Sequence, residues 1–589
     1  MKTAEDLRRQ LASIDRRGYP AYKGLRGSYD MHGFTLSVDH VQGDPFAAPS
    51  KLSVVVPRAS AGFPSSLYEG DHRRRALEDL LVRRFSAQAA KASFKVGGSG
   101  KSGLLATCRP GPAVLERSAC EVRDGSVILR FEAGFPAHGR TVDARALERM
   151  LLDYVPRCVH GALVCDERML AAATEAAELA DDQLAARREL ERLGLVAFVA
   201  DGSVLPRESG VSSRPMRGAR PFVSPESMRV TLDLPHRGPT TGMGVRRGVT
   251  LVVGGGYHGK STLLRALQEG VYDHVVGDGR ELVVTDRTAV KLRAEDGRSV
   301  RDTDISLFIG ELPDGRDTRR FSTADASGST SQAAAVVEAV EAGSRTLLVD
   351  EDTSATNFMV RDALMEAVVT GDHEPITPFV ERVRDLWERA GVSTVIVAGS
   401  SGAFFSVADA VVQMDRYEAI DITDRVRDVC RDLGAPATRR APAFALPAEK
   451  RALAVGAVPG SAGGDAHRGR DRGHGRSRGR GNAGGSDARI KVRCQGLDAL
   501  TVGSASADLR LVEQLVDPEQ VAALAGLVRA MMQSGLLDGR EPLVDAVDAA
   551  LRLVAEKGWG VLSDYGVASC GLAMPRRQEL LACLRRMRW

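Results

Sequence analysis

The residues best suited to chemistry form a glycine-rich run that ends in a lysine and two hydroxyl residues. This spacing is that of a phosphate-binding loop, in which a curled glycine backbone turns its N–H groups toward phosphate oxygens and the next helix directs its positive end there. An apolar stretch, residues 249–253, precedes it as a strand should. The run predicts a nucleoside triphosphate site made by Gly254, Gly255, Gly256, Tyr257, His258, Gly259, Lys260, Ser261 and Thr262.

Two carboxylates, Asp350 and Glu351, follow a second apolar stretch, residues 346–349. An apolar strand that ends in two acids is typical of a Walker B strand. We expect Asp350 and Ser261 to hold Mg²⁺, and Glu351 to orient or deprotonate the attacking water. Such a strand end is common by itself. Together with Lys260, which should reach the β- and γ-phosphates, it predicts ATP hydrolysis with Lys260 and Glu351 as catalytic residues.

A serine-rich run, residues 326–332, lies between these motifs, and its Ser327 precedes Asp350 by 23 positions. That separation is typical of the signature motif and Walker B strand of ATP-binding cassettes. In such cassettes the signature residues, here Ser327, Gly328 and Ser329, contact the γ-phosphate held by the opposite subunit. The same residues also suit a helix N-cap. One cassette per chain predicts a symmetric homodimer with two composite sites.

The chain resembles the ABC-class ATPases of bacteria, which are related to an ATPase found with the trypanosome mitochondrial RNA-editing machinery. The resemblance covers nearly the whole chain, and its landmarks are residues 39–46, 97–103, 277–281, 326–332 and 350–359. It implies a three-part protein that binds ATP, dimerises and contacts RNA.

Several positions depart from ordinary transporter cassettes. Where a switch histidine normally follows the strand 393–398, Gly399, Ser400 and Ser401 stand instead. Ser400 or Ser401 is the candidate for a weaker version of that role, and His258 is either a substitute or a solvent-facing loop residue. No Q-loop glutamine is visible in residues 301–308, where Asp304 is the polar candidate. These departures predict slow turnover.

Two further expectations concern ligand contacts. Phe222 is a weak candidate to stack on the adenine. The glycine-rich segment 97–103 looks like a second phosphate loop, but the residues before Pro110 predict a short strand where a helix would be needed. We expect a glycine turn there, with an anion or RNA-backbone contact through Lys101 as the alternative.

Composition limits the class of protein. The chain has 589 residues and a net charge of +3, so any affinity for nucleic acid must come from local patches. It contains no apolar run of about eighteen residues and no secretory leader, which predicts a cytoplasmic protein without a membrane span. The eight cysteines lack metal-binding spacing and are expected to be reduced thiols.

The predicted fold class is α/β, with a P-loop ATP-binding-cassette core, an N-terminal α+β domain and a small, mostly helical C-terminal domain. Residues 1–221 form the predicted N-terminal domain, residues 222–440 the ATPase domain, and residues 489–589 the C-terminal domain. The connecting segment, residues 441–488, is Arg- and Gly-rich and is expected to be a disordered linker.

Three basic segments could contact RNA. The linker carries six arginines within residues 467–480, which suits phosphate backbones and base stacking. The other two are residues 72–84 in the N-terminal domain and a last helix after Pro575 that carries Arg585 and Arg586. A solvated charged face is the alternative interpretation of each.

The sequence thus favours a homodimeric ABC-class ATPase that hydrolyses ATP with Mg²⁺ and couples its nucleotide state to binding or remodelling single-stranded RNA. One alternative is a nucleotide-gated assembly protein with incidental hydrolysis and no nucleic acid. A phosphoryl-transfer enzyme acting on a small metabolite is disfavoured, because it would not need a signature motif.

Overall fold

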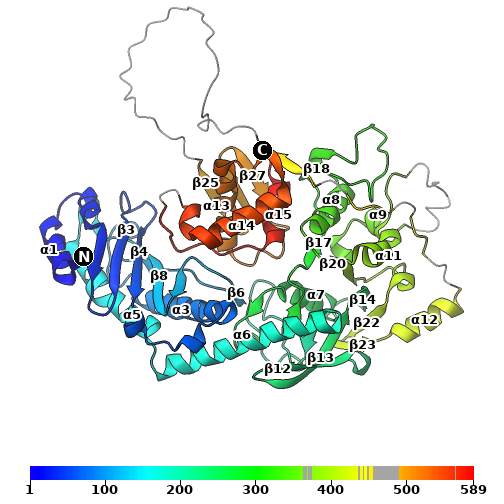
Figure 1. The fold of residues 1–589 in the computed structure, drawn as a ribbon, viewed down its shortest axis with the longest axis horizontal. Helices are drawn as coiled ribbons and strands as arrows, with labels where there is room; N and C mark the ends of the chain where they lie inside the picture. Colours follow the sequence, from blue (N-terminus) through cyan, green and yellow to red (C-terminus); the bar gives the residue numbers. More distant parts are fainter. Residues whose placement is uncertain are drawn as a thin grey trace, which may run out of the picture.

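The computed structural model describes residues 1–361, 368, 374–434, 438–441, 444–447, 450–455, 490–563 and 566–589. The described chain forms three regions along one long axis (Figure 1). The N-terminal region lies at one end, the P-loop region at the other, and the C-terminal region sits between them on one side. The predicted Arg-rich run at residues 467–480 lies outside the described residues, and the domain boundaries stay predictions.

The N-terminal region is built on a seven-stranded sheet with the order β1-β2-β3-β4-β8-β5, in which β7 also pairs with β8. Strands β4 and β8 alternate buried and partly exposed residues, the pattern of a sheet with one face on the core. The strands are β1 (Lys2–Thr3), β2 (Gly27–Asp30), β3 (Thr35–His40), β4 (Ser50–Val56), β5 (Leu105–Ala106), β7 (Cys120–Arg123) and β8 (Ser126–Ala133). The predicted short strand before Pro110 is confirmed as β5.

Helices cover the core of this region. The longer ones are α1 (Ala4–Ile14), α3 (Asp71–Ala92) and α5 (Val155–Leu163), and α2 (Arg58–Ala61) and α4 (Ala144–Arg149) are short. The amphipathic helix α1 buries Leu7 and Leu11. A two-stranded sheet, β9 (Ala137–His138) with β10 (Thr141–Val142), lies at its edge.

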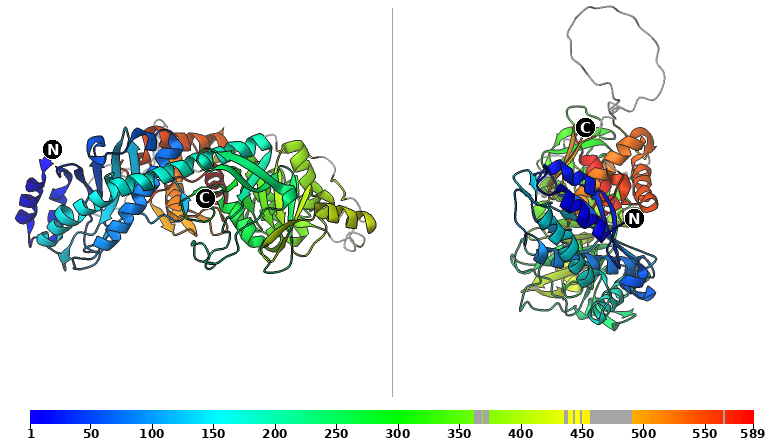
Figure 2. Two further views of the ribbon diagram at one scale, coloured as in Figure 1. Left: turned by 90° about the horizontal axis from the view of Figure 1, so that it is seen from below. Right: turned by 90° about the vertical axis from the view of Figure 1, so that its left-hand side faces the viewer.

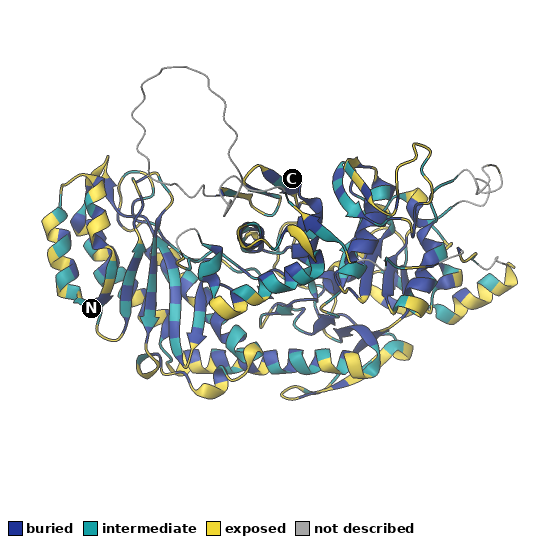
Figure 3. Ribbon diagram, turned by 45° about the horizontal axis from the view of Figure 1, so that its top comes forward, coloured by how far each residue is buried: buried dark blue, intermediate teal, exposed yellow. Residues whose placement is uncertain are grey.

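One long helix, α6 (Glu167–Leu193), runs from the N-terminal region along the P-loop region (Figures 1 and 2). Asp166 caps its first turn and Gly194, with φ +65°, ends it. It alternates buried and exposed residues, whereas the central strands of the P-loop region are mostly buried (Figure 3). A small sheet of β6 (Ala113–Val114) and β15 (Asp273–His274) also joins the two regions.

The P-loop region contains a six-stranded sheet with the order β17-β20-β21-β14-β22-β23. All neighbours are parallel except β22 and β23. The strands are β14 (Val249–Val253), β17 (Val290–Leu292), β20 (Thr346–Asp350), β21 (Ser393–Val397), β22 (Ala410–Asp415) and β23 (Glu418–Asp421). Helices α7 (Lys260–Glu269), α8 (Gly328–Glu341), α9 (Thr356–Met359), α11 (Phe379–Ala390) and α12 (Thr423–Asp432) surround it.

The central strands of this sheet, β14, β20 and β21, are mostly apolar and buried, as expected of parallel strands with both faces covered. Leu251 and Val349 pack into the cluster that contains α8 and α11 residues, and Val252 and Leu348 pack against α7 on the other face. A second, four-stranded sheet has the order β12-β13-β11-β16 and consists of β11 (Leu195–Ala200), β12 (Arg229–Leu234), β13 (Gly238–Arg246) and β16 (Val283–Thr285). A further pair is β18 (Arg298–Thr303) with β19 (Phe321–Ala326).

The C-terminal region packs three helices, α13 (Pro518–Ser534), α14 (Leu543–Lys557) and α15 (Arg577–Arg586), against a three-stranded sheet. Asp517 and Gln520 form a capping box at the start of α13, and Gly535 ends the helix in the left-handed conformation. The sheet strands are β25 (Val492–Gln495), β26 (Ala499–Val502) and β27 (Ala505–Asp508); β24 (Ala452–Ala454) pairs with β28 (Asp538–Pro542). Among the described helices, none is long and apolar enough to cross a membrane.

Candidate functional site

The phosphate-loop sequence connects β14 to α7 as predicted. Gly254 must be glycine, because its φ is +143° and a Cβ there would lie 2.3 Å from the carbonyl oxygen of Met414. Gly259 has φ +102° and lies against the ring of Tyr417. Contacts with β22 and with the β22–β23 turn therefore restrict the backbone conformation of the loop.

The Lys260 side chain is folded back onto this loop. Its Nζ donates hydrogen bonds to the carbonyl oxygens of Gly254 (2.6 Å) and Gly255 (2.9 Å), and the residue is buried. Ser261 is exposed at the first turn of α7, next to the partly exposed Thr262. The ammonium group thus lies against the phosphate loop itself. A rotation of the Lys260 side chain would bring it to an anion bound by the loop N–H groups.

The two predicted carboxylates lie at the carboxyl edge of the same sheet. Asp350 is the last residue of β20, and β21 separates that strand from β14. The Asp350 carboxylate accepts a hydrogen bond from the Asp352 N–H (3.2 Å). Burial raises the pKa of Asp350, and the nearby Lys291 ammonium opposes that rise.

Glu351 is bound by the segment that replaces the switch histidine. Its carboxylate accepts hydrogen bonds from the Gly399 N–H (2.8 Å), the Ser400 N–H (3.2 Å) and the Ser400 hydroxyl (2.7 Å). Partial burial acts to raise the pKa of Glu351, but these hydrogen bonds outweigh it, so the pKa lies below its ordinary value. Ser400 therefore contacts the carboxylate expected to handle the attacking water, an interaction that the sequence did not reveal.

The signature residues lie at the start of α8. The Ser327 hydroxyl caps this helix by accepting from the Thr330 N–H (3.4 Å), as the N-cap interpretation predicts. Ser327 is exposed, whereas Gly328 and Ser329 are buried. Within the described chain, no hydrogen bond links α8 to residues 254–262; its Gln332 side chain instead accepts from the Ala355 N–H (2.9 Å) beyond β20.

Asp304, the polar candidate for the Q-loop, does not follow a strand of the six-stranded sheet. It follows β18, which pairs with β19 in a separate sheet. The strand beside β20 is β17, and residues 293–296 follow it. Because β17 has only three residues, its apolar signal was too short to recognise. The Glu295 N–H donates to the Ser331 hydroxyl (2.8 Å), which ties this segment to the signature helix.

Lys291 of β17 is a site residue that sequence reasoning missed. Its Nζ donates to the Thr353 hydroxyl (3.2 Å), just beyond the Walker B strand. Together with Ser261 and Asp350 it lines a cavity of about 630 Å³ whose other walls come from the N- and C-terminal regions. Burial lowers the pKa of Lys291. A polar residue within an apolar strand of three is the only sequence signal that could have identified it.

The C-terminal region reaches the same cavity through Glu513, and the next residue, Gln514, binds the P-loop region. The Glu513 carboxylate pairs with Arg293 (2.7 Å). The Gln514 side chain accepts from the Lys291 N–H (3.0 Å) and donates to the Gln268 carbonyl (3.2 Å) at the end of α7. The region therefore contacts both the helix that starts at the phosphate loop and the strand beside Walker B.

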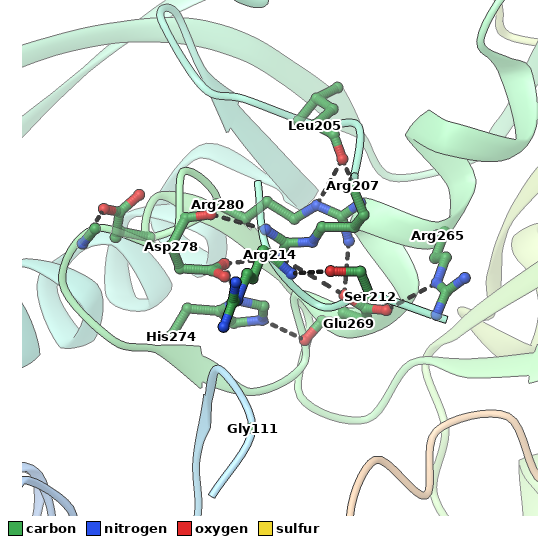
Figure 4. Close-up of polar contacts among 12 residues, drawn as sticks. Gly111, Leu205, Arg207, Ser212, Arg214, Arg265, Glu269, His274, Asp278 and Arg280 are labelled. Atoms are coloured by element: carbon green, nitrogen blue, oxygen red, sulfur yellow. Dashed lines mark hydrogen bonds and ion pairs between the residues drawn. The ribbon is translucent and has the colours of Figure 1, made fainter. Parts of the chain in front are cut away.

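A buried charged cluster anchors the carboxyl end of α7 (Figure 4). Arg280, which is 1% exposed, donates to Glu269 of α7 (2.6 Å), and Arg207 donates to Asp278 (2.8 Å). Burial lowers the pKa of Arg280 to about 10. The landmark 277–281 supplies two of these groups, so it holds the phosphate-loop helix in place from its far end.

Two other expectations, for Phe222 and His258, are corrected. Phe222 is 2% exposed in an apolar cluster and cannot stack on a nucleotide in this structure. His258 is not a free solvent-facing residue, because its Nδ1 accepts from the Arg416 N–H (3.0 Å) and its carbonyl oxygen accepts from the Tyr417 N–H (3.0 Å). These contacts dock the β22–β23 turn onto the phosphate loop, which a single sequence cannot reveal.

The basic sets after Pro575 and in residues 72–84 are not solvated faces. Arg585 and Arg586 are buried and pair with Glu341 (2.8 Å) and Glu295 of the P-loop region. In α3, the partners of His72, Arg73, Arg74 and Arg83 are Asp181, Asp71, Glu78 and Asp79. Asp181, Glu78 and Asp79 are largely buried, so the cations that pair with them are held within the fold, whereas Arg84 is exposed.

Three family descriptions match successive parts of the chain. The P-loop domain of the ABC ATPases matches residues 169–451, and the N-terminal domain of ATPases of the ABC class matches residues 4–166. The C-terminal domain of MRB1590, the trypanosome editing-associated ATPase, matches residues 491–589. The chain belongs to the ABC-class ATPase family. The predicted fold class, a P-loop core with an N-terminal and a C-terminal domain, is confirmed.

This ABC-class ATPase is also similar to individual proteins. It is 29% identical over 249 residues to the uncharacterised protein MJ1628 of Methanocaldococcus jannaschii, covering 40% of this chain and 54% of that relative. Among solved structures, cbiO1 of Clostridium perfringens, part of an ABC transporter complex, matches 41% of this chain and 95% of its own (TM-score 0.25, 13% identity). The ADP conformation of MJ1267, an ATP-binding cassette, matches 33% and 88% (TM-score 0.23, 14% identity).

Proposed function

We propose that this ABC-class ATPase hydrolyses ATP to ADP and phosphate with Mg²⁺ as a cytoplasmic homodimer, and couples its nucleotide state to holding or remodelling single-stranded RNA. The observation that carries the hydrolytic part is the meeting of Lys260, Asp350 and Glu351 at one edge of the six-stranded sheet. In open α/β sheets, ligands bind outside the carboxyl ends of the strands.

The residues at the cavity suit a magnesium nucleotide. The exposed Ser261 hydroxyl and the Asp350 carboxylate line one cavity, and both are oxygen donors of the kind that Mg²⁺ prefers. Bound there, the ion would neutralise charge on the phosphates. Residues 254–262 bind the phosphates through backbone N–H groups, and Lys260 exchanges its two carbonyl partners for phosphate oxygens.

Glu351 orients the water and accepts its proton. Its lowered pKa keeps the carboxylate ionised, the form that can accept a proton. In this structure, Ser400 and Gly399 take up three of the roughly four acceptor positions of its carboxylate, so little capacity is left for a water. That competition is consistent with slow turnover.

The dimer proposal rests on the signature residues. Ser327 is exposed at the N-terminus of α8, where orphan N–H groups favour an anion, and α8 makes no described hydrogen bond to its own phosphate loop. Ser327, Gly328 and Ser329 therefore act on the nucleotide held by a second copy. In a symmetric, head-to-tail dimer, each nucleotide contacts the phosphate loop of one copy and the signature residues of the other.

The RNA part rests on family membership and on the Arg-rich run. The C-terminal domain is of the type named after the trypanosome editing-associated ATPase. Residues 467–480 contain six arginines, whose charges and planar faces suit an RNA strand.

The test is steady-state ATP hydrolysis, titrated with single-stranded RNA at about 0.15 M salt so that weak surface contacts are screened. Glu351→Gln should keep ATP binding but lose about 10²- to 10⁴-fold in turnover, the range for a general base. Asp352→Asn, which alters the exposed neighbouring carboxylate, is the matched control and should stay near wild type. Unchanged turnover in Glu351→Gln would contradict the role of Glu351 as the base. ATP hydrolysis and ATP binding that do not change when RNA is added would contradict the coupling to RNA.

The second candidate is a nucleotide-gated assembly protein with incidental hydrolysis. The observation that favours it is the Gly399–Ser400–Ser401 segment, which offers no imidazole at the switch position and binds Glu351 instead. Stable ATP-dependent dimers without measurable RNA affinity would select this function.

A further inference from the structure

Two phenylalanines of the N-terminal region stand out because they are exposed. Phe46 is 66% exposed and Phe94 is 62% exposed. A large ring left in water forgoes the burial that normally stabilises aromatic side chains, so such exposure suggests a role in contact with another molecule.

The backbone holds both rings away from the core. The Asp44 carboxylate accepts from the N–H groups of Phe46 (2.8 Å) and Ala47 (3.1 Å), which fixes the turn that presents Phe46. Phe94 has φ +59°, a left-handed conformation that is strained for a bulky residue, and its N–H donates to the Gly103 carbonyl (2.8 Å). The fold maintains this conformation although it costs free energy.

Two landmarks of the sequence, residues 39–46 and 97–103, meet between these phenylalanines. The Lys101 N–H donates to the Pro45 carbonyl (2.9 Å). A Cβ on Gly100 would lie 2.3 Å from that oxygen and 3.1 Å from the Phe46 ring, and one on Gly103 would lie 2.1 Å from the Val96 carbonyl. These glycines let the backbone of the loop 97–103 pack directly against the backbone of Pro45 and Val96, which holds the loop in one conformation.

Three lysines lie close to Phe94 in the sequence, and the loop after it has free donors. Lys91, Lys95 and Lys101 form no ion pair with a described residue, although the Lys95 ammonium lies 5.8 Å from the centre of the Tyr154 ring. The N–H groups of Gly97, Gly98 and Gly100 donate no hydrogen bond to any described group. Exposed amides beside a lysine are suited to phosphate oxygens.

We propose that Phe46 and Phe94, together with the loop 97–103 and Lys101, form a binding site for single-stranded RNA, with bases stacked on the rings and backbone phosphates on the lysine and open amides. This inference rests on the RNA part of the proposed function and locates it in the N-terminal region. Rings and cations that alternate along a surface are the combination that single strands require. A contact with a second copy is disfavoured because the three lysines would repel their counterparts.

The experiment measures the affinity of the full chain for a labelled single-stranded RNA of about 16 nucleotides by fluorescence anisotropy. Phe46→Ala and Phe94→Ala should each weaken binding about tenfold, and Phe94→Tyr should bind like wild type because it keeps a ring. Lys101→Gln should weaken binding and reduce the salt dependence by about one charge. Leu433→Ala, which removes an apolar side chain that is 79% exposed on another region, should change nothing.

Basal ATP hydrolysis and thermal unfolding of the Phe variants should match wild type, because neither ring contacts the nucleotide site or the core. If wild type binds RNA and the alanine variants bind equally well, the site is refuted while the RNA function stands. If wild type does not bind RNA, the RNA function itself fails, and this site fails with it. Altered self-association with unchanged RNA affinity would overturn the proposal in favour of a protein contact.

Discussion

The ion pair between Arg586 and Glu295 should decide whether the C-terminal region stays docked on the P-loop region. Their side chains are 9% and 8% exposed, and the guanidinium meets the carboxylate through two nitrogens, one at 3.1 Å. Burial acts to raise the pKa of Glu295, but Arg586 outweighs it, so the pKa lies below its ordinary value. Arg586→Met would leave this carboxylate buried without its main partner.

Breaking a buried pair in this way costs about 3–5 kcal/mol. We expect the lower figure, because Arg298 also lies close enough to lower the pKa of Glu295. The Lys291 amide reports undocking directly, since its hydrogen bond is to Gln514 of the C-terminal region. A loss of about 3 kcal/mol corresponds to roughly 150-fold faster exchange of this amide, if the region opens as a unit.

Hydrogen exchange with mass spectrometry of the peptide containing residues 289–297 is the assay. Arg577→Met is the matched control on the same helix, because its partner Asp548 is half-buried and lies within the C-terminal region. Adding Glu295→Gln to Arg586→Met should recover most of the loss. The defect should shrink as the pH falls toward 4.5, because protonation neutralises the unpaired Glu295. Exchange accelerated less than about fivefold in Arg586→Met would refute the reasoning.

Two further predictions concern the N-terminal region. Gly103→Ala should destabilise this region by about 3 kcal/mol or more, since a Cβ there would lie 2.1 Å from the Val96 carbonyl oxygen. The control Gly139→Ala, also at positive φ but with no atom near the new Cβ, should cost about 1 kcal/mol. Equal melting temperatures of the two variants would contradict this prediction. Burial raises the pKa of Glu78 to about 7, so wild type should lose stability relative to Glu78→Gln as the pH rises from 4.5 to about 7; parallel melting curves across that window would contradict it.

The sequence by itself determined the features that depend on spacing along the chain. The phosphate loop, the Walker B strand and the N-cap at Ser327 could be predicted because glycine conformation, apolar runs and capping are local properties. The same holds for α1, α6 and α13, whose periodic apolar residues or capping residues mark them without knowledge of their neighbours.

Only the tertiary structure decided which distant groups meet. Strand order put β17 beside Walker B, so that residues 293–296 and not Asp304 follow the neighbouring strand of the sheet. Tertiary packing buries Phe222 in the core. It also pairs Arg585 and Arg586 with carboxylates of the P-loop region, although the sequence around these arginines is typical of an exposed helix face. Local preference cannot specify these contacts, because the free energy of a buried charge or ring depends on partners hundreds of residues away along the chain.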